Sequence, residues 1–505
     1  MTAVRGAGSV GSGLAPAREA RPVRSDERIH VVGVAGAGAS AAALLAFHRG
    51  AAVSGCDAGG PSPYTPPLAA AGIRLDWGHD PRHVSDAPPP ERLAVTKALT
   101  AVDPDNPELA AARAAGVPIE PWQQVIADAA VGKTLAGVAG THGKSTTAGW
   151  LVHVLVAAGL DPCAFVGALL PAALTGGLPS TARWGWGAPF VVEADEYAGN
   201  FDAYRPDVAI LTSAEWDHPD VFADRDAVIG SFEAWLRRAA EAGRRPALVA
   251  NLGDSGVAAV ARRLHDWPGT VRGTVLRETG APSGGGVWLT GTISAADATG
   301  TTLRMEGASL GAPVVARLKL AGRHNASNAL GVAGAALVLG VSPDAMGAAL
   351  GSFNGVGRRL ERKGEGRGVV VYDDYGHHPT AIRETLAALR QLEPGRRIWA
   401  VYEPLTYHRT AAMLDEFAAV LATADAVAIA DIWASRDPDT TITSAAELAE
   451  ATARRRPGLL SVAPGTVDQT AEWLAREVRS GDAVLVMGGG KSYRIAELLM
   501  EALGS

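Results

Sequence analysis

Short apolar runs alternate with turns and with alanine- and leucine-rich stretches along most of the chain. The runs have the length of strands, and the stretches between them have helical spacing. Such runs include "IHVVGVAG", "TLAGVAG", "PFVVEAD", "DVAILTS", "GVVVYDD" and "DAVLVMGGG". This alternation predicts an α/β fold in which parallel sheets carry helices on both faces.

One stretch departs from this rhythm, and three restarts divide the chain. Residues 266–320 are rich in threonine, valine and glycine without helical spacing, which predicts an antiparallel patch. The alternation restarts near residues 28, 133 and 357. We therefore expect three α/β domains at 28–132, 133–356 and 357–505, of which the first and the last are Rossmann-like.

Composition and charge exclude several classes of protein. The chain has 505 residues and a formal net charge of −7. The folded part has no basic block, so no nucleic-acid partner is expected. No apolar run reaches membrane-spanning length, so no membrane partner is expected either. Cys56 and Cys163 are far apart in the sequence and predict neither a disulfide framework nor a cysteine metal cluster.

The first 27 residues differ in composition from the rest. They are rich in glycine and alanine, contain several arginines and lack the apolar core of a signal peptide. Residues 1–27 are therefore expected to be a disordered leader. We expect a cytoplasmic protein that is a monomer or a weak homodimer.

The segment "TLAGVAGTHGKSTTAGW" places a glycine turn between a strand and a helix. The turn comprises Gly140, Thr141, His142, Gly143, Lys144, Ser145 and Thr146. In a P-loop, backbone N–H groups and the helix N-terminus converge on phosphate oxygens. Lys144 would then contact the β- and γ-phosphates, and Ser145 would offer its hydroxyl to Mg²⁺. Val138 stands where the full motif has its first glycine, which leaves open a turn that only caps the helix through Thr141 or Ser145.

Acids and a histidine follow the next two strands. "VVEADEYAGNF" contains Glu193, Asp195 and Glu196, and "EWDHPD" contains Asp217 and His218. The carboxyl ends of parallel strands form the edge at which ligands bind in open α/β sheets. These residues are therefore candidate metal ligands. The alternatives are a helix cap or a solvated acid for Glu193, and a loop histidine for His218.

A second glycine turn opens the first domain. "GVAGAGAS" contains Gly36, Gly38 and Ser40, and Asp57 ends the next strand. Glycines let a backbone approach a pyrophosphate, and the acid can bind a ribose. A dinucleotide-dependent oxidoreductase stays open on this segment alone, but it leaves the P-loop unexplained.

Several segments together resemble a known family. "GTHGKST", "EADEYAGNF", "EWDHPD", "GRHNASNALGVAGAAL", "GVGRRLE" and "DDYGHHPTAI" are similar to motifs of the Mur ligases, the ATP-dependent amide-forming enzymes of peptidoglycan assembly. The resemblance covers nearly the whole chain. It implies ATP and Mg²⁺ as cofactors. It also implies a UDP-substrate-binding first domain, a central P-loop ATP-binding α/β domain and an amino-acid-binding third domain.

The resemblance also assigns roles to residues. Lys144, His218 and Arg409 would be catalytic, and Ser145, Glu193 and His218 would hold Mg²⁺. The nucleotide would be bound by Gly140, Thr141, His142, Gly143, Lys144, Ser145, Thr146, Asn325, Asn328 and Asp374. The UDP part of the substrate would lie on Gly36, Gly38, Ser40 and Asp57, and the amino acid on Tyr375 and His377. Arg358 and Arg359 would lie at an interdomain hinge. Helix capping remains open for the two asparagines, and turn packing for His377 and His378.

One branch of the family fits best. No lysine occurs between Lys144 and Lys319, so the carbamylated lysine of several Mur ligases is expected to be absent. This resembles the branch that joins L-alanine to the lactyl carboxylate of UDP-N-acetylmuramate through an acyl phosphate. Lys97, the Leu405-Thr406 pair and Lys491 depart from the family pattern. A ligase that recycles a tripeptide onto UDP-N-acetylmuramate and a non-catalytic nucleotide-binding relative remain alternatives.

Overall fold

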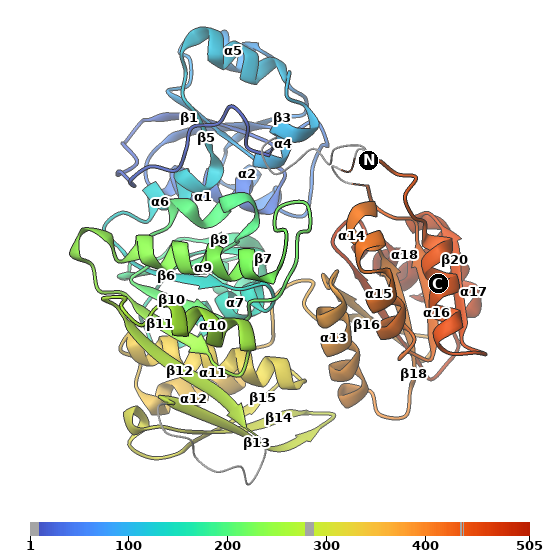
Figure 1. Ribbon diagram of the computed structural model, residues 1–505. Coiled ribbons are helices and arrows are strands. Elements are labelled where there is room, and N and C mark those ends of the chain that lie inside the picture. The colour runs from blue at the N-terminus through green and yellow to red at the C-terminus, as the bar shows by residue number, and fades with distance from the viewer. Residues whose placement is uncertain (1–9, 278–286, 435–436, 438, 505) are drawn as a thin grey trace.

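Three separate sheets follow one another along the chain. The computed structural model describes residues 10–277, 287–434, 437 and 439–504 (Figure 1). The first sheet lies within residues 28–121, the second within 134–318 and the third within 361–488. Each domain boundary expected from the sequence therefore falls between two sheets, and the predicted α/β fold is confirmed.

The first sheet is fully parallel, with the strand order β3-β2-β1-β4-β5. Its strands are β1 (Arg28–Val32), β2 (Ala52–Cys56), β3 (Arg74–Asp76), β4 (Arg92–Val95) and β5 (Ile119–Pro121). The helices of this domain are α1 (Ala37–His48), α2 (Pro66–Ala70), α3 (Arg82–Ser85), α4 (Lys97–Val102), α5 (Pro107–Ala115) and α6 (Trp122–Ala129). The order of strands β3-β2-β1-β4 reverses direction beside β1, so the glycine turn after β1 lies where such sheets bind ligands.

The central sheet has ten strands in the order β15-β14-β13-β12-β11-β10-β6-β9-β7-β8. They are β6 (Thr134–Ala139), β7 (Cys163–Leu170), β8 (Ser180–Arg183), β9 (Pro189–Ala194), β10 (Val208–Leu211), β11 (Ala247–Asn251), β12 (Thr270–Arg277), β13 (Leu289–Asp297), β14 (Gly300–Glu306) and β15 (Val314–Leu318). The antiparallel patch predicted for 266–320 is confirmed for β13, β14 and β15, whereas β12 pairs in parallel with both neighbours.

The register of this sheet positions the phosphate turn. Ala139, the last residue of β6, pairs with Ala194 of β9 on one side and with Leu211 of β10 on the other. All three strands are parallel and end at the same edge, so the segments that follow them meet there. Helices flank this sheet: α7 (Lys144–Ala157), α8 (Ala172–Thr175), α9 (Arg225–Ala239), α10 (Ser255–Arg263), α11 (Arg323–Val338), α12 (Pro343–Ser352) and the short 3₁₀ helix η2 (Tyr197–Ala203).

The third sheet is parallel except for its edge strand β16, and its order is β16-β17-β21-β18-β19-β20. The strands are β16 (Glu361–Gly366), β17 (Val369–Asp374), β18 (Arg397–Glu403), β19 (Ala426–Ala430), β20 (Leu460–Gly465) and β21 (Asp482–Gly488). The helices are α13 (Pro379–Leu392), α14 (Tyr407–Ala412), α15 (Leu414–Leu421), α16 (Ala445–Arg455), α17 (Val467–Glu477) and α18 (Tyr493–Gly504).

Both faces of the third sheet are buried, as a run of apolar residues without alternation predicts. Along β17, Val370 and Tyr372 pack with α13 and α15 in one apolar cluster. Val369 and Val371 point to the other face and pack with α17 and α18. Period-two alternation thus sends successive side chains of one strand into two different cores.

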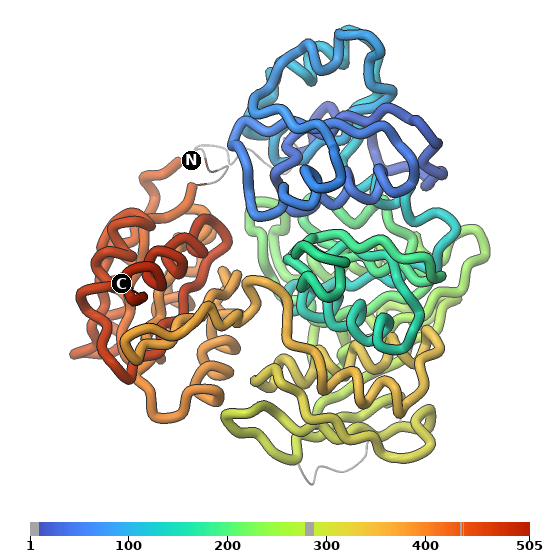
Figure 2. Tube along the Cα trace, turned by 180° about the vertical axis from the view of Figure 1, so that it is seen from behind, coloured from blue at the N-terminus to red at the C-terminus, as the bar shows by residue number. Residues whose placement is uncertain are grey.

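The first two domains are stacked on one another, and the third lies beside the central one (Figure 1). One apolar cluster joins α1 and α6 of the first domain to the central domain. The chain then crosses to the third domain between α12 and β16 (Figure 2). Arg358 and Leu360 lie in this crossing and have positive φ angles of 56° and 49°, a conformation uncommon for residues other than glycine.

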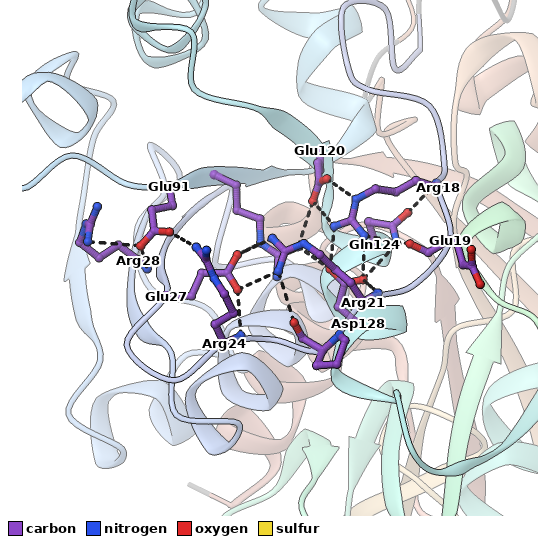
Figure 3. Close-up of polar contacts among 12 residues, drawn as sticks. Arg18, Glu19, Arg21, Arg24, Glu27, Arg28, Glu91, Glu120, Gln124 and Asp128 are labelled. Carbon is purple, nitrogen blue, oxygen red and sulfur yellow. Dashed lines mark hydrogen bonds and ion pairs between the residues drawn. The ribbon is translucent and has the colours of Figure 1, made fainter.

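The expectation of a disordered leader is wrong for residues 10–27. Figure 3 shows this segment lying along the first domain with its arginines turned toward acidic side chains. Arg18 Nε lies 2.7 Å from Glu120 Oε1, and its Nη2 lies 2.8 Å from Asp128 Oδ2. Arg21 Nη2 lies 2.6 Å from Glu27 Oε1. Residues 1–9 of the expected leader lie outside the described residues.

The physical reason lies in the charges that the leader covers. Glu27, Glu120 and Asp128 are all buried, and Arg92, which contacts all three, is itself only 1% exposed. A single guanidinium cannot compensate three buried carboxylates, and an uncompensated buried charge is costly. The leader arginines supply the missing positive charge, so the segment is ordered by ion pairs without an apolar core of its own.

No described helix is long and apolar enough to cross a membrane.

Candidate functional site

The phosphate turn has the geometry of an anion-binding loop. Gly140 and Gly143 have φ angles of 136° and 82°. A Cβ atom at Gly140 would lie 2.1 Å from Thr212 Oγ1, and one at Gly143 would lie 2.6 Å from Asn328 Oδ1. Both positions therefore require glycine. Gly143 is the N-cap of α7, and neither Thr141 nor Ser145 caps this described helix with its side chain. The amide groups of its first turn are thus available to a phosphate.

Lys144 begins α7 and reaches across to the end of β9. Its Nζ lies 2.9 Å from Glu196 Oε2 and 3.3 Å from Asp195 Oδ1. Burial opposes the positive charge, but these two carboxylates outweigh it and raise the pKa of Lys144 above its usual range. The ammonium is therefore charged at neutral pH and available for phosphate oxygens.

Two of the expected magnesium ligands lie side by side. Ser145 Oγ donates to Glu193 Oε1 at 3.0 Å, and the Gly167 N–H donates to Glu193 Oε2 at 2.7 Å. The hydroxyl and the carboxylate are the oxygen ligands that Mg²⁺ prefers. Their positions fit the predicted metal site, and neither the helix-cap nor the solvated-acid alternative describes Glu193, which is only 9% exposed.

His218 lies apart from that pair and in a different set of contacts. Arg409 Nη2 lies 2.7 Å from Asp217 Oδ1 and 3.1 Å from His218 Nδ1. A guanidinium only donates hydrogen bonds, so Nδ1 accepts and Nε2 carries the ring hydrogen of a neutral imidazole. Nitrogen is also a poor ligand for Mg²⁺. In this arrangement His218 therefore offers no metal-binding lone pair, although it groups with Asp195 and Glu196.

Asp217 and Arg409 form a buried ion pair between the central and third domains. Their side chains are 6% and 4% exposed. Burial opposes ionisation, but the Arg409 guanidinium holds the pKa of Asp217 well below its usual range. The guanidinium expected to face the substrate is thus anchored on the central domain.

The third domain also reaches the phosphate turn through the crossing segment. Arg359 Nη2 donates to Ser145 Oγ at 3.0 Å, and its guanidinium lies 5.1 Å from the ring centre of Tyr375. Asp374 accepts the Leu360 N–H at 2.7 Å and the Gly376 N–H at 2.7 Å. The carboxylate of Asp374 therefore holds the crossing segment and the loop after β17 together.

His377 and His378 differ in what they do. His377 Nδ1 lies 2.9 Å from the Tyr375 carbonyl oxygen, and burial, together with Arg409, holds the pKa of His377 well below its usual range. Its Nδ1–H therefore donates to that carbonyl and leaves Nε2 as an acceptor. His378 caps α13 by accepting the Thr380 N–H and also lines the first cavity.

Two cavities meet at the phosphate turn. The first, of about 430 Å³, is lined by all three domains, including Gly38, Trp122, Lys144, Glu193, His218, Tyr375, His377 and Arg409. The second, of about 390 Å³, lies between the central and third domains and is lined by Thr146, Asn325, Asn328 and Asp374 among others. His142, Gly143 and Arg359 line both.

The two asparagines lie inside α11 and do not cap this described helix, whose N-cap is Gly322. Asn325 Nδ2 donates to the Ala321 carbonyl oxygen at 2.8 Å. Asn328 approaches Gly143 of the phosphate turn. The helix-cap alternative is therefore wrong, and both amides border the second cavity.

The first-domain residues are only partly brought to the site. Gly38 lines the first cavity. Asp57 accepts the Ala35 and Gly59 N–H groups at 3.0 and 2.8 Å and so fixes the glycine turn that contains Gly36. Ser40 is fully buried, donates to the Ala37 carbonyl oxygen and lies 3.2 Å from Thr181 Oγ1. Its hydroxyl therefore lies in the contact between the first and central domains.

Comparisons with known proteins bear on all three domains. Residues 28–134 match the catalytic domain of the Mur ligase family, residues 138–336 the Mur ligase middle domain, and residues 358–490 the glutamate ligase domain of Mur ligases. The chain belongs to the Mur ligase family. The expected family is thus confirmed.

Relatives of this Mur ligase cover almost its whole length. It is 40% identical over 468 residues to UDP-N-acetylmuramate–L-alanine ligase of Kineococcus radiotolerans, and the alignment covers 92% of this chain and 93% of the relative. It is 37% identical to the ligase of the same name of Paenarthrobacter aurescens, over 94% and 97% of the two chains.

Solved structures share the fold. The UDP-N-acetylmuramate–alanine ligase of Thermotoga maritima aligns with a TM-score of 0.75 at 24% identity, over 94% of this chain and 98% of that one. A murein peptide ligase of Psychrobacter arcticus aligns with a TM-score of 0.69 at 25% identity, over the same shares.

Two contacts of this Mur ligase site were not found by sequence reasoning. Arg359 was expected only at a hinge, yet it contacts Ser145, 214 positions earlier in the chain. Lys97, which departs from the family pattern, donates to the Ala198 carbonyl oxygen at 2.8 Å and so ties the first domain to η2. No local pattern signals either partner, because both contacts join segments that are distant in sequence.

Proposed function

We propose that this Mur ligase joins L-alanine to the lactyl carboxylate of UDP-N-acetylmuramate, driven by ATP. The observation that carries the proposal is that two cavities meet at Gly143. The second cavity has the size of a nucleotide, and the first is lined by all three domains. The named relatives at 37–40% identity support the same substrates.

In this proposal ATP lies in the second cavity. Asn325 and Asn328 border this cavity, with Asn328 close to Gly143 of the turn, and an amide can offer both a donor and an acceptor to adenine. The phosphates then run along the first turn of α7, so that the γ-phosphate enters the first cavity beside Lys144. There the ammonium neutralises charge that develops on the phosphoryl oxygens.

Ser145 and Glu193 are the residues that would hold Mg²⁺. The bound ion would neutralise phosphate charge, as it does in other ATP-dependent transfers. His218 can add a ligand only after Arg409 moves away, which frees Nδ1 either to bind the ion or to take the ring hydrogen from Nε2. We therefore propose Ser145 and Glu193 as the primary ligands and His218 as a conditional one.

The reaction has two steps. An oxygen of the lactyl carboxylate attacks the γ-phosphorus, the bond to the ADP oxygen breaks, and an acyl phosphate forms. The free amine nitrogen of L-alanine then attacks the acyl carbon and releases one proton to solvent, the carbon–oxygen bond to phosphate breaks, and the amide and inorganic phosphate result. Arg409, in the wall of the first cavity, stabilises the negative charge of the tetrahedral intermediate.

His377 and Tyr375 are proposed to position the amine. The free Nε2 of the neutral His377 can accept a hydrogen bond from the amino group of L-alanine, because its Nδ1–H is held by the Tyr375 carbonyl. The low pKa of His377 keeps the imidazole neutral, so Nε2 retains the lone pair that accepts this hydrogen bond. We further propose that the protein acts in the cytoplasm, as a monomer or a weak homodimer.

The test measures phosphate release from ATP and Mg²⁺ in the presence of UDP-N-acetylmuramate. L-alanine, glycine, L-serine and the tripeptide are compared as amines. We expect release that requires the nucleotide sugar and is fastest with L-alanine. A preference for the tripeptide would assign the chain to the recycling ligases, and folded protein without amine-dependent release would assign it to the non-catalytic relatives.

Lys144→Ala provides the decisive variant. Loss of the ammonium is expected to reduce kcat by about 10²–10³-fold. Lys319→Ala is the matched control in the same domain, since Lys319 is paired with Asn354 in an exposed contact. Circular dichroism and melting curves of both variants separate a catalytic effect from unfolding.

A further inference from the structure

A cluster of metal-binding side chains lies in the first domain, away from the two cavities described above. His30 of β1, Cys56 of β2, His83 of α3 and Glu108 of α5 offer donor atoms that all lie within 4.8 Å of one another. His30, Cys56 and Glu108 are at most 1% exposed. Neither the ligase reaction nor the nucleotide sites use this cluster.

The distances match those between the ligands of one small cation. His30 Nε2 lies 3.2 Å from Glu108 Oε2, His83 Nδ1 lies 2.8 Å from Glu108 Oε1, and Cys56 Sγ lies 3.1 Å from the same oxygen. In a tetrahedral zinc site, bonds of about 2.0–2.3 Å place neighbouring donors roughly 3.3–3.8 Å apart. The side chains are therefore already close to a coordinating arrangement.

Two histidines are oriented as metal ligands usually are. His30 Nδ1 lies 2.8 Å from Ser54 Oγ, which leaves Nε2 directed at the cluster. That buried Nε2 has no hydrogen-bond partner of acceptable geometry among the described residues. His83 Nε2 lies 3.6 Å from Asp76 Oδ2, which leaves its Nδ1 for the cluster. Such outer partners fix the ring and its tautomer at metal sites.

We propose that this cluster is a structural site for a divalent transition metal of the zinc class. The mixture of a thiol, two imidazoles and a carboxylate suits zinc or cobalt and does not suit Mg²⁺, which prefers oxygen ligands alone. Binding replaces the Cys56 thiol proton, which is released to solvent, with a sulfur–metal bond.

The site has an entry path and a structural consequence. His79 Nδ1 lies 3.4 Å from Cys56 Sγ, and the side chains of His79 and His83 are 14% and 12% exposed, so a cation can reach the cluster from their side. A bound ion would tie β1 and β2 to α3 and α5. Cys56 directly precedes Asp57, which holds the glycine turn, so the ion would stiffen the proposed UDP site.

Cobalt titration of the full-length protein tests the proposal. The protein is freed of metal with a chelator under reducing conditions and titrated with Co²⁺. We expect one equivalent to produce a sulfur-to-cobalt charge-transfer band in the near ultraviolet, and Zn²⁺ to displace it. Zn²⁺ should also raise the melting temperature of the metal-free protein. The band reports on the thiolate and not on ligase activity, so its outcome is independent of the proposed reaction and of Mg²⁺.

Cys56→Ser should abolish the band while keeping the size of the side chain. Cys163→Ser is the matched control, because Cys163 is the other buried free cysteine and belongs to the central domain. If Cys56→Ser fails to fold, His83→Gln at the rim should weaken Co²⁺ binding at least tenfold. The absence of a band in wild-type protein, or a band that survives Cys56→Ser, would overturn the proposal and leave Glu108 as a hydrogen-bonded buried acid.

Discussion

The central domain meets its two neighbours through interfaces of opposite character. Toward the first domain the contact is mostly apolar: Trp122 packs edge-on against Phe165 with ring centres 5.3 Å apart, within one continuous cluster. Lys97 and Gln123 add hydrogen bonds across it. Toward the third domain the contacts are mostly polar, such as Arg409 with Asp217 at 2.7 Å and Arg359 with Ser145 at 3.0 Å. Trp216 adds an apolar contact there.

This difference indicates which domain moves. Separating the first and central domains would expose apolar surface, which costs about 25 cal/mol for each Å². Separating the central and third domains exchanges polar contacts for contacts with water, which costs far less. The site lies between these two interfaces, so we infer that opening of the third domain admits substrates and releases products, and that its closure excludes water from the acyl phosphate.

The largest expected effect comes from Arg409→Ala at the polar interface. We expect kcat to fall by about 10²–10³-fold, because the guanidinium faces the first cavity and also orients His218. The melting temperature of Arg409→Ala should fall less than that of a variant that breaks an ion pair buried within a single domain. The reason is that the third domain can open and let water hydrate Asp217. Arg390→Ala, which removes an exposed pair on the same domain, is the control. A large loss of stability with unchanged kcat would contradict the comparison.

Gly38→Val tests the apolar interface. A Cβ atom at Gly38 would lie 2.2 Å from Cζ2 of Trp122, and a rigid ring packed against Phe165 cannot yield easily. Overpacking of this kind costs about 1–3 kcal/mol or more, so we expect a lower melting temperature in calorimetry. Gly36→Ala in the same turn is the control, because its Cβ would meet only the Gly33 carbonyl oxygen at 3.4 Å. Equal melting temperatures for the two variants would show that the Trp122 ring can yield, and with it the packing against Phe165, without loss of stability.

A pH effect is expected from Glu403 of the third domain. Burial raises the pKa of Glu403 to about 7 from 4.5, so the folded state holds a proton that the unfolded state releases. Stability therefore falls as pH rises from 4.5 to about 7 and changes no further from this group above that. Calorimetry across this range should show a drop of roughly 2–4 °C that Glu403→Gln reduces. Asp373, whose pKa is raised to about 6 by burial, contributes the remainder.

Glu472→Gln, at an exposed position of α17, should leave that slope in place. The first domain differs because its buried Glu27 is ion-paired with Arg21, and the pKa of Glu27 is held at about 2, below this pH range. A slope that is undiminished in Glu403→Gln would assign the pH dependence to another group.

The smallest effect is expected from Thr380→Val. Thr380 Oγ1 donates to Glu215 Oε2 at 2.8 Å across the polar interface, and one such hydrogen bond contributes about 0.5–1.5 kcal/mol. We expect kcat/KM for ATP to fall by roughly 2–10-fold with an unchanged melting temperature. Thr423→Val, at an exposed threonine whose hydroxyl donates to the Val420 carbonyl oxygen, should change neither quantity. A loss of stability in Thr380→Val alone would show that closure also maintains the fold.

The phosphate turn could be predicted because its function depends on consecutive residues. Gly143 and Lys144 adjoin in sequence, and the strand before and the helix after them fix where the lysine points. The leader shows the opposite case. Composition favours disorder there, and nothing local reveals that Arg18 meets Asp128, 110 positions away.

The sequence by itself determined the order of the three α/β domains, the antiparallel strands β13 to β15, and the residues of the phosphate turn, because periodicity and short motifs act through neighbouring residues. Tertiary structure alone decided the partners: Arg409 with Asp217, Arg359 with Ser145, and His30 with Cys56 and Glu108. These contacts depend on how sheets stack and where their edges meet. Burial then makes each pairing consequential, since a charge or a donor removed from water must find its complement among residues that only the fold brings near.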